Sequence, residues 1–299
     1  MQKQNKIFLA FYKFGGIKYL TASILPVLIG TTLPFWLNPP NFEFNIINAI
    51  LFLIMTIIGH SGFSLIYIAL MENKNLKLKR ESLLIWGLLF LTVSIILGLL
   101  INSSLQFQPK VPEYIFIIYG MTTVFAGVLY VFPPFSFHQR LYGDMVISVG
   151  LGMLPVLGAY LIQVGDITRT VYLASLPVVV STGLWVWITE LINLKENKKK
   201  GYKTTVMYFN KKFSSRIITI FLILIIYVSL VLAVFGRSSL NPISLTALFS
   251  IIFAGLIIKK IWTDYKSIKV LKKVEKYAFL IHLSICIAII LASFSSIFK

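Results

Sequence analysis

The sequence has few charged residues, very few acidic ones and a single cysteine. Of its 299 residues only 13% are charged, 10 are Asp or Glu, and 58% are apolar. A water-soluble domain of this composition would lack the polar surface to cover itself, so a soluble fold is excluded. The lone Cys286 excludes a disulfide framework within the chain. What the sequence has instead is a series of long apolar runs.

These runs are long enough to cross a bilayer, because about 20 apolar helical residues span roughly 30 Å of hydrocarbon. They lie near residues 17–37, 47–70, 83–101, 114–131, 145–163, 171–193, 215–236, 242–260 and 277–297. The first run is too long for the core of a signal peptide, so we expect it to stay in the mature protein. We predict an all-α integral membrane protein with about nine transmembrane helices, forming one membrane domain over residues 1–299.

The basic residues indicate how the helices are oriented. The net charge is +18, with 28 Lys and Arg residues. If the N-terminus is cytosolic and the C-terminus outside, only Lys110, Arg169, Arg237 and Lys299 face outward, as the positive-inside rule requires. Attraction to anionic membrane lipid accounts for the remaining positive charge, so no nucleic-acid partner is expected.

Two polar segments on the predicted inner side, 72–82 and 194–214, are where chemistry is expected. In the second, Glu190, Asn193 and Asn197 follow at spacings of three and four, which places them on one helical face. A carboxylate and two amides could coordinate a hard cation or bind a polar head group. An ordinary solvated helix end has the same pattern, so spacing alone leaves both interpretations open.

Other candidates are weaker on sequence alone. His60 lies deep in the second run, where a polar side chain is costly and is either functional or bonded to a neighbouring helix. His138 is expected at the membrane interface, and His282 has no evident partner. Trp185 and Trp187, just before Glu190, are the aromatic pair expected near a site.

Four stretches of sequence carry a family resemblance. They are 19–30 (YLTASILPVLIG), 130–135 (YVFPPF) with Arg140, Gly143 and Asp144 after it, 150–160 (GLGMLPVLGAY) and 201–204 (GYKT). Their order and spacing resemble the UbiA superfamily of membrane prenyltransferases, most closely the 1,4-dihydroxy-2-naphthoate polyprenyltransferase branch of menaquinone biosynthesis. The resemblance implies a helical bundle around a central cavity open to lipid. It also implies a site on the cytosolic side of a bacterial or archaeal cytoplasmic membrane.

The same resemblance implies a reaction and a cofactor. Members ionise a polyprenyl diphosphate with Mg²⁺, and an aromatic acceptor then attacks the allylic cation. Two Asp-rich motifs hold the metal in the family. Here the first motif, Asn-Asp-x-x-Asp-x-x-x-Asp, falls without gaps on Ser64, Leu65, Ile68 and Glu72.

The second motif places Glu190, Asn193 and Asn197 where acids normally stand. Leu and Ile cannot bind a metal, and Asn is a neutral ligand that offsets none of its charge. With Glu72, Glu190 and Glu196 as the acidic ligands, the site fits one Mg²⁺ and not two.

Two functions stay open on this evidence. The first is a prenyltransferase that moves a polyprenyl group to an aromatic quinone precursor, with Glu72, Glu190, Asn193 and Asn197 as catalytic residues. Its diphosphate is expected to contact Ser64, Lys74, Lys77, Arg140, Lys198 and Lys203. The alternative is a catalytically lapsed relative that binds an isoprenoid or quinone lipid, or serves a partner as a membrane subunit. A transporter is disfavoured, because the apolar runs carry almost no charge.

Overall fold

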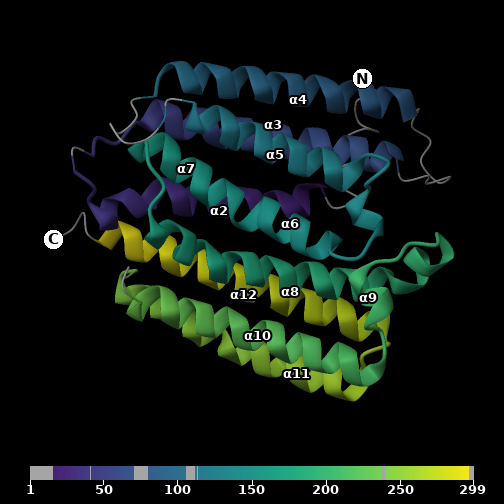
Figure 1. Cartoon of the computed structure of the whole chain (residues 1–299). Coiled ribbons are helices and arrows are strands. Elements are labelled where there is room, and N and C mark those ends of the chain that lie inside the picture. The colour runs from purple at the N-terminus through teal and green to yellow at the C-terminus, as the bar shows by residue number, and fades with distance from the viewer. Residues whose placement is uncertain are drawn as a thin grey trace, which may run out of the picture.

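The computed structural model describes residues 16–40, 42–70, 80–105, 112, 114–236 and 240–295. In this part of the chain every regular element is a helix. The long ones are α2 (Gly16–Leu37), α3 (Ile46–Leu70), α4 (Arg80–Ser103), α5 (Ile115–Val131), α6 (Gly143–Gly152), α7 (Leu154–Val164), α8 (Arg169–Lys199), α10 (Lys212–Phe235), α11 (Ile251–Asp264) and α12 (Ile268–Phe294). They lie side by side, from α4 at one edge of the bundle to α10 and α11 at the other (Figure 1).

The helices match the predicted membrane protein. Among the described residues, 8 helical segments are long and apolar enough to cross a bilayer, counting α6 with α7, and α11 with the 3₁₀ turn Pro242–Ser250 before it. The helix α5 is apolar too, but has only 17 residues. With α5 included, the segments correspond one to one with the nine predicted spans. The predicted all-α membrane fold is therefore confirmed.

Two helices extend further than hydropathy predicted. The helix α12 begins at Ile268 and not near residue 277, with the Ser267 hydroxyl accepting the N–H of Val270 as an N-cap. Its first turns carry Lys272, Lys273 and Lys276, which lower the hydropathy without breaking a helix. For the same reason α8 runs through a lysine-rich end to Lys199, so part of the predicted loop 194–214 is helical.

The predicted fifth span is two helices and not one. The helix α6 ends at Gly152 and α7 begins at Leu154. Pro155 follows the break, and proline has no N–H to donate to the preceding turn. Beside the break, Gly152 packs so closely on α8 that an added Cβ would lie 2.8 Å from the Cα of Val179.

The helix α2 lies at the centre of the bundle, against α7, α12 and α3. Gly30 makes its contact with α7 possible, because a Cβ at this position would lie 2.1 Å from the carbonyl oxygen of Val156. The stretches 19–30 and 150–160 are therefore packed on each other, which gives a physical reason for their small residues.

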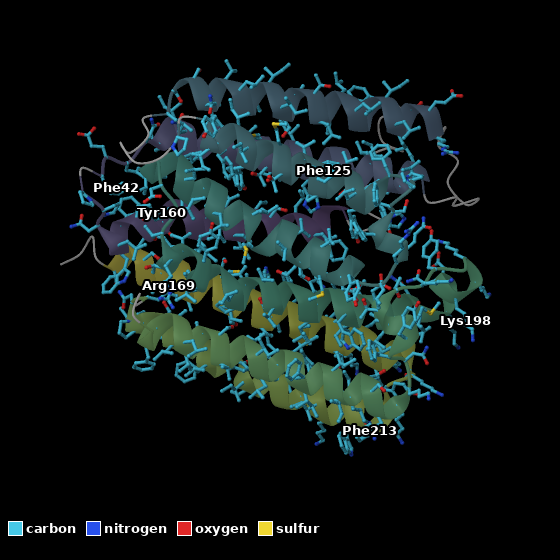
Figure 2. All side chains as sticks on the ribbon, in the orientation of Figure 1. Phe42, Phe125, Tyr160, Arg169, Lys198 and Phe213 are labelled. Carbon is cyan, nitrogen blue, oxygen red and sulfur yellow. The ribbon has the colours of Figure 1, made fainter. Side chains whose placement is uncertain are left out.

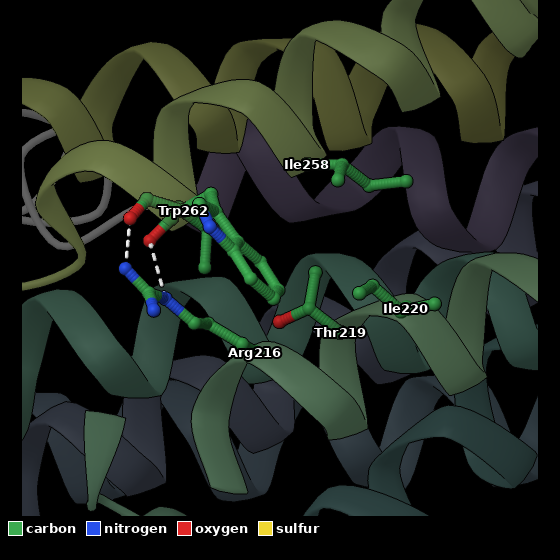
Figure 3. A pocket seen from close by; sticks show the side chains of 6 residues that line it. Arg216, Thr219, Ile220, Ile258 and Trp262 are labelled. Carbon is green, nitrogen blue, oxygen red and sulfur yellow. Dashed lines mark hydrogen bonds between the residues drawn. The ribbon is translucent and has the colours of Figure 1, made fainter. Parts of the chain in front are cut away.

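On the far side of the bundle, α10 and α11 are joined at their polar ends (Figure 3). The guanidinium of Arg216 lies 4.5 Å from the ring centroid of Trp262 and donates to the carbonyl oxygens of Ile261 and Trp262. Cation–π stacking and hydrogen bonds to the last carbonyls of a helix both stabilise such an arrangement. Arg216 therefore has a structural role, and its side chain lines a small pocket between α10 and α11.

Candidate functional site

A large cavity lies between α2, α3, α4, α5, α6, α7 and α8. Its volume is about 810 Å³, which is in the range of sites for sizeable organic ligands. Most of its wall is apolar, including Phe52, Phe63, Leu91, Val124 and Leu151. Such a wall suits a hydrocarbon chain and offers little to an ion in transit.

The wall of this cavity reaches the outer apolar surface between α4 and α5. Leu99 of α4 is 57% exposed, and Met121 and Phe125 of α5 are 68% and 60% exposed, yet all three also line the cavity. Figure 2 labels Phe125 on α5, near the α4 edge of the bundle. The cavity wall and the outer apolar surface of the bundle therefore share side chains of α4 and α5. The side chains of α3, α4, α5 and α6 supply most of the cavity wall.

One part of the cavity wall is polar, near the end of α8 that carries its lysines. Glu190 and Asn193 line the cavity there. One helical turn beyond, Asn197 is buried and its Nδ2 donates to Glu190 Oε2 at 2.9 Å. The structure thus brings together the three residues whose spacing predicted a shared face.

Asp144, in the first turn of α6, adds a second carboxylate. Its charge acts on Glu190, so the two groups repel each other when both are ionised. Its Oδ2 atom is buried and has no hydrogen-bond partner among the described residues. Two carboxylates that interact electrostatically, one of them with an orphaned oxygen, are a donor set that a divalent cation would satisfy.

The residues present fit one Mg²⁺ shared with a substrate. In the described part of the chain, no three His, Cys, Asp or Glu side chains gather as metal ligands. Mg²⁺ does not need such a cage, since it commonly uses one or two carboxylates, several waters and substrate phosphates. Asp144 and Glu190 would supply the carboxylates, and Asn193 a neutral oxygen.

Several positions of the first motif lie on α3. Some of them line the cavity, and others pack against a neighbouring helix. Ser64 and Ile68 line the cavity. Leu65 is 3% exposed and lies in an apolar cluster with Ile68, Ala69 and Leu83 of α4. Glu72, Lys74 and Lys77 lie outside the described residues, so the predicted pairing of Glu72 with Glu190 stays a prediction.

The remaining predicted residues lie outside the cavity wall. Lys198 and Lys203 are exposed, and the guanidinium of Arg140 donates to the carbonyl of Pro134. Glu196 is also exposed, and its Oε1 pairs with Lys200 Nζ at 2.7 Å. Glu196 is therefore not part of the acidic site around Glu190. The lysines lie on the protein surface, and from there they can attract an anion but do not line the cavity.

The 201–204 stretch turns the chain back over the polar end of the cavity. Gly201 has φ +73°, a left-handed conformation that glycine adopts without strain, and it ends α8. The backbone N–H of Lys203 then donates to the carbonyl of Gln139 at 2.7 Å. This bond joins two stretches that the sequence resemblance had identified separately.

His138 lies at this junction and is 7% exposed, so its side chain is buried within the protein. Its Nδ1 donates to the Tyr130 carbonyl at 2.8 Å, and its Nε2 accepts from Gln139 Nε2 at 3.0 Å. The rings of Tyr67, Tyr130 and Tyr202 surround it at centroid distances of 5.0, 5.9 and 6.0 Å. Burial lowers the pKa of His138, and its bond to the Tyr130 carbonyl partly opposes that shift.

Tyr67 and Tyr130 line the cavity but were not expected there. The signal for Tyr67 was present, because His60, Ser64 and Tyr67 are spaced four and three residues apart and so share a face of α3. The two tryptophans point differently: Trp185 lines the cavity with Tyr19, whereas Trp187 donates to Thr219 on α10 at 3.1 Å.

Comparison with known proteins agrees with this geometry. The UbiA prenyltransferase family model matches residues 75–283, and the chain belongs to this family. No curated protein sequence matches the chain.

Solved structures share the fold at low identity. A digeranylgeranylglyceryl phosphate synthase is 16% identical with a TM-score of 0.67, covering 99% of this chain and 100% of its own. A UbiA homologue from Aeropyrum pernix K1 is 10% identical with a TM-score of 0.59, covering 88% and 97%. A UbiA homologue from Archaeoglobus fulgidus, bound to DMAPP and Mg²⁺, is 15% identical with a TM-score of 0.52, covering 92% and 99%.

Proposed function

We propose that this prenyltransferase moves a polyprenyl group from its diphosphate to an aromatic quinone precursor. The observation that carries the proposal is a cavity of about 810 Å³ whose wall is mostly apolar and carries the carboxylate of Glu190 at one end. A polyprenyl diphosphate has the same division, with a long hydrocarbon chain and a charged head. The family assignment supports transfer, and the 130–135 and 150–160 stretches favour an aromatic acceptor through their resemblance to that branch.

The polar end is suited to hold the diphosphate. Bound there, Mg²⁺ would neutralise charge on the leaving diphosphate, with Asp144 and Glu190 as protein ligands. Asn197 orients Glu190 through its hydrogen bond of 2.9 Å. The exposed Lys198 and Lys203 raise the local concentration of the anionic head group.

The aromatic side chains are suited to the cation that forms next. When the C–O bond breaks, both electrons leave with the diphosphate and the prenyl carbon becomes an allylic cation. The rings of Tyr67 and Tyr130 line the cavity near Glu190, and aromatic faces attract such a charge. The acceptor ring then supplies the electron pair of the new C–C bond, and its displaced proton passes to the released diphosphate.

The test is turnover by the purified protein in nanodiscs. With 1,4-dihydroxy-2-naphthoate, a polyprenyl diphosphate and Mg²⁺, we expect a prenylated product that mass spectrometry detects. When EDTA replaces Mg²⁺, we expect no product. A parallel reaction offers a glyceryl phosphate lipid as acceptor, since one structural neighbour makes such a product. Product from the glyceryl lipid alone would show that the acceptor class is wrong.

Absence of product with every acceptor would favour the lapsed relative. In that case Asp is introduced at Leu65, Ile68, Asn193 and Asn197 together, which supplies the carboxylates of the two motifs. Activity gained by that variant, and missing from the natural protein, would establish that the natural site is catalytically lapsed.

A further inference from the structure

Midway along the cavity, α2 and α3 are joined by a polar pair. Ser23 Oγ and His60 Nδ1 lie 2.7 Å apart. Both residues line the cavity, but Ser23 is only 1% exposed whereas His60 is half-buried. The wall nearby also carries the hydroxyl groups of Thr56 and Ser64. The imidazole of this pair, however, is a polar group that neither the diphosphate nor the prenyl chain requires.

The position of the imidazole proton follows from the serine. A buried hydroxyl hydrogen needs an acceptor, and among the described residues the only partner of Ser23 Oγ is His60 Nδ1. The hydroxyl therefore donates to Nδ1. In the neutral ring the proton is then on Nε2, which has no partner in the described part of the chain.

Other hydroxyl groups in the wall are arranged differently. Those of Thr56, Ser94, Thr123 and Thr182 donate to the backbone carbonyls of Phe52, Met55, Tyr119 and Val178. These bonds use up the hydrogen and leave nothing directed at a ligand. The Ser23–His60 pair instead presents an N–H donor at the cavity wall.

A second serine–histidine pair shows what a purely structural arrangement looks like. His282 is fully buried, with Nδ1 2.9 Å from Ser181 Oγ and Nε2 3.7 Å from Cys286 Sγ. Both ring nitrogens have partners within the protein, so the sequence-based view that His282 lacks a partner is wrong. His60 differs because one nitrogen is left for a ligand.

We infer that the Ser23–His60 pair is a subsite for an oxygen atom of the acceptor, with His60 Nε2–H donating to a carboxylate, carbonyl or phenol oxygen. An isoprenoid chain could not satisfy this donor, and an unmatched donor in an apolar cavity is costly. The inference rests on the proposed function and adds to it the residue that selects the acceptor.

The spacing along α3 agrees with an acceptor lying between the pair and the acidic end. Seven residues separate His60 from Tyr67, which is about 10 Å at 1.5 Å per residue. An aromatic ring system with its oxygen on His60 can therefore extend toward Ser64 and Tyr67, where the allylic cation would form. The Ser23 hydroxyl acts as a positioning group, because it fixes the tautomer that donates.

The test compares ligands as well as variants. Equilibrium affinities are measured without prenyl diphosphate for 1,4-dihydroxy-2-naphthoate, 2-naphthoate and 1,4-dihydroxynaphthalene. We expect His60→Leu to weaken binding of the first about tenfold to a hundredfold, as for a hydrogen bond to a charged or strongly polar group. The loss should vanish for the analogue that lacks the oxygen bound by His60. His60→Gln keeps an N–H donor and should retain part of the affinity, and Ser23→Ala should lose several-fold.

His282→Leu is the matched control, because it removes the buried pair and leaves the cavity wall intact. It should change the melting temperature without any ligand-dependent change in affinity. An equal loss for all three ligands in His60→Leu would mean a structural role and overturn the inference. Unchanged affinity in His60→Leu would also overturn the inference, because it would mean that only water binds Nε2. So would a natural protein that binds none of the three ligands. Failure of the proposed function is recognised separately, by absence of turnover in the natural protein.

Discussion

At the scale of single residues, the two glutamates near the end of α8 have different surroundings. Glu190 lines the cavity and interacts electrostatically with Asp144, whereas Glu196 is exposed and paired with Lys200. Glu190→Gln keeps the size of the side chain but removes the charge that would hold Mg²⁺. We expect it to lower turnover about 10²–10³-fold, as loss of one electrostatic group in a reaction centre does.

Glu196→Gln is the control, and we expect it to retain the activity of the natural protein, because exposed ion pairs contribute little. Turnover is measured at saturating prenyl diphosphate. If both substitutions reduce it equally, the acidic site is not centred on Glu190.

His138 gives a prediction for the dependence of stability on pH. Burial lowers its pKa below the ordinary value of 6.5 in the folded protein. Below pH 6.5 the unfolded chain therefore binds more protons than the folded one, and the free energy of unfolding falls as pH falls. We expect the melting temperature of the natural protein to drop more between pH 7 and pH 5 than that of His138→Gln. Equal slopes for the two proteins would contradict a buried, neutral His138.

At the scale of the helices, hydropathy predicted all the membrane segments. It did not predict where a helix begins or breaks when charged residues or proline determine that position. It placed the start of α12 near residue 277 because Lys272, Lys273 and Lys276 lower the mean, although the Ser267 cap begins the helix. It also merged α6 and α7, because an apolar run gives no sign that Pro155 interrupts the hydrogen bonds.

The contact between α2 and α7 can be tested through its glycine. In Gly30→Ala the new Cβ would meet the carbonyl oxygen of Val156, a backbone atom that cannot turn away. We expect the free energy of unfolding to fall by about 1–3 kcal/mol, the usual cost of overpacking. Gly255 of α11 has open space at the same position, so Gly255→Ala should leave stability equal or raise it. Equal melting temperatures for the two variants would refute the close packing.

At the scale of the whole molecule, the only part of the candidate site that could be predicted is the part formed by residues close together on one helix. Spacing predicted that Glu190, Asn193 and Asn197 share one face of α8, and in the structure the first two line the cavity while Asn197 donates to Glu190. The pairing of Ser23 with His60, 37 residues apart, and the tyrosines around His138 arise from contacts between different helices. No periodicity within one helix encodes such contacts, so the acceptor subsite could not be read from the sequence.

The orientation in the membrane remains a prediction, and α8 offers a direct test. Arg169 and Lys198 are exposed near its two ends, about 43 Å apart at 1.5 Å per residue (Figure 2). Since Cys286, the one native cysteine, is fully buried, it gives little background to thiol labelling. We expect Arg169→Cys to react with a membrane-impermeant thiol reagent in intact cells, and Lys198→Cys to react only after lysis, because lysines concentrate on the cytosolic side. The opposite pattern would invert the topology and place the acidic end of the cavity outside. Labelling of both from one side would mean that α8 does not cross the membrane.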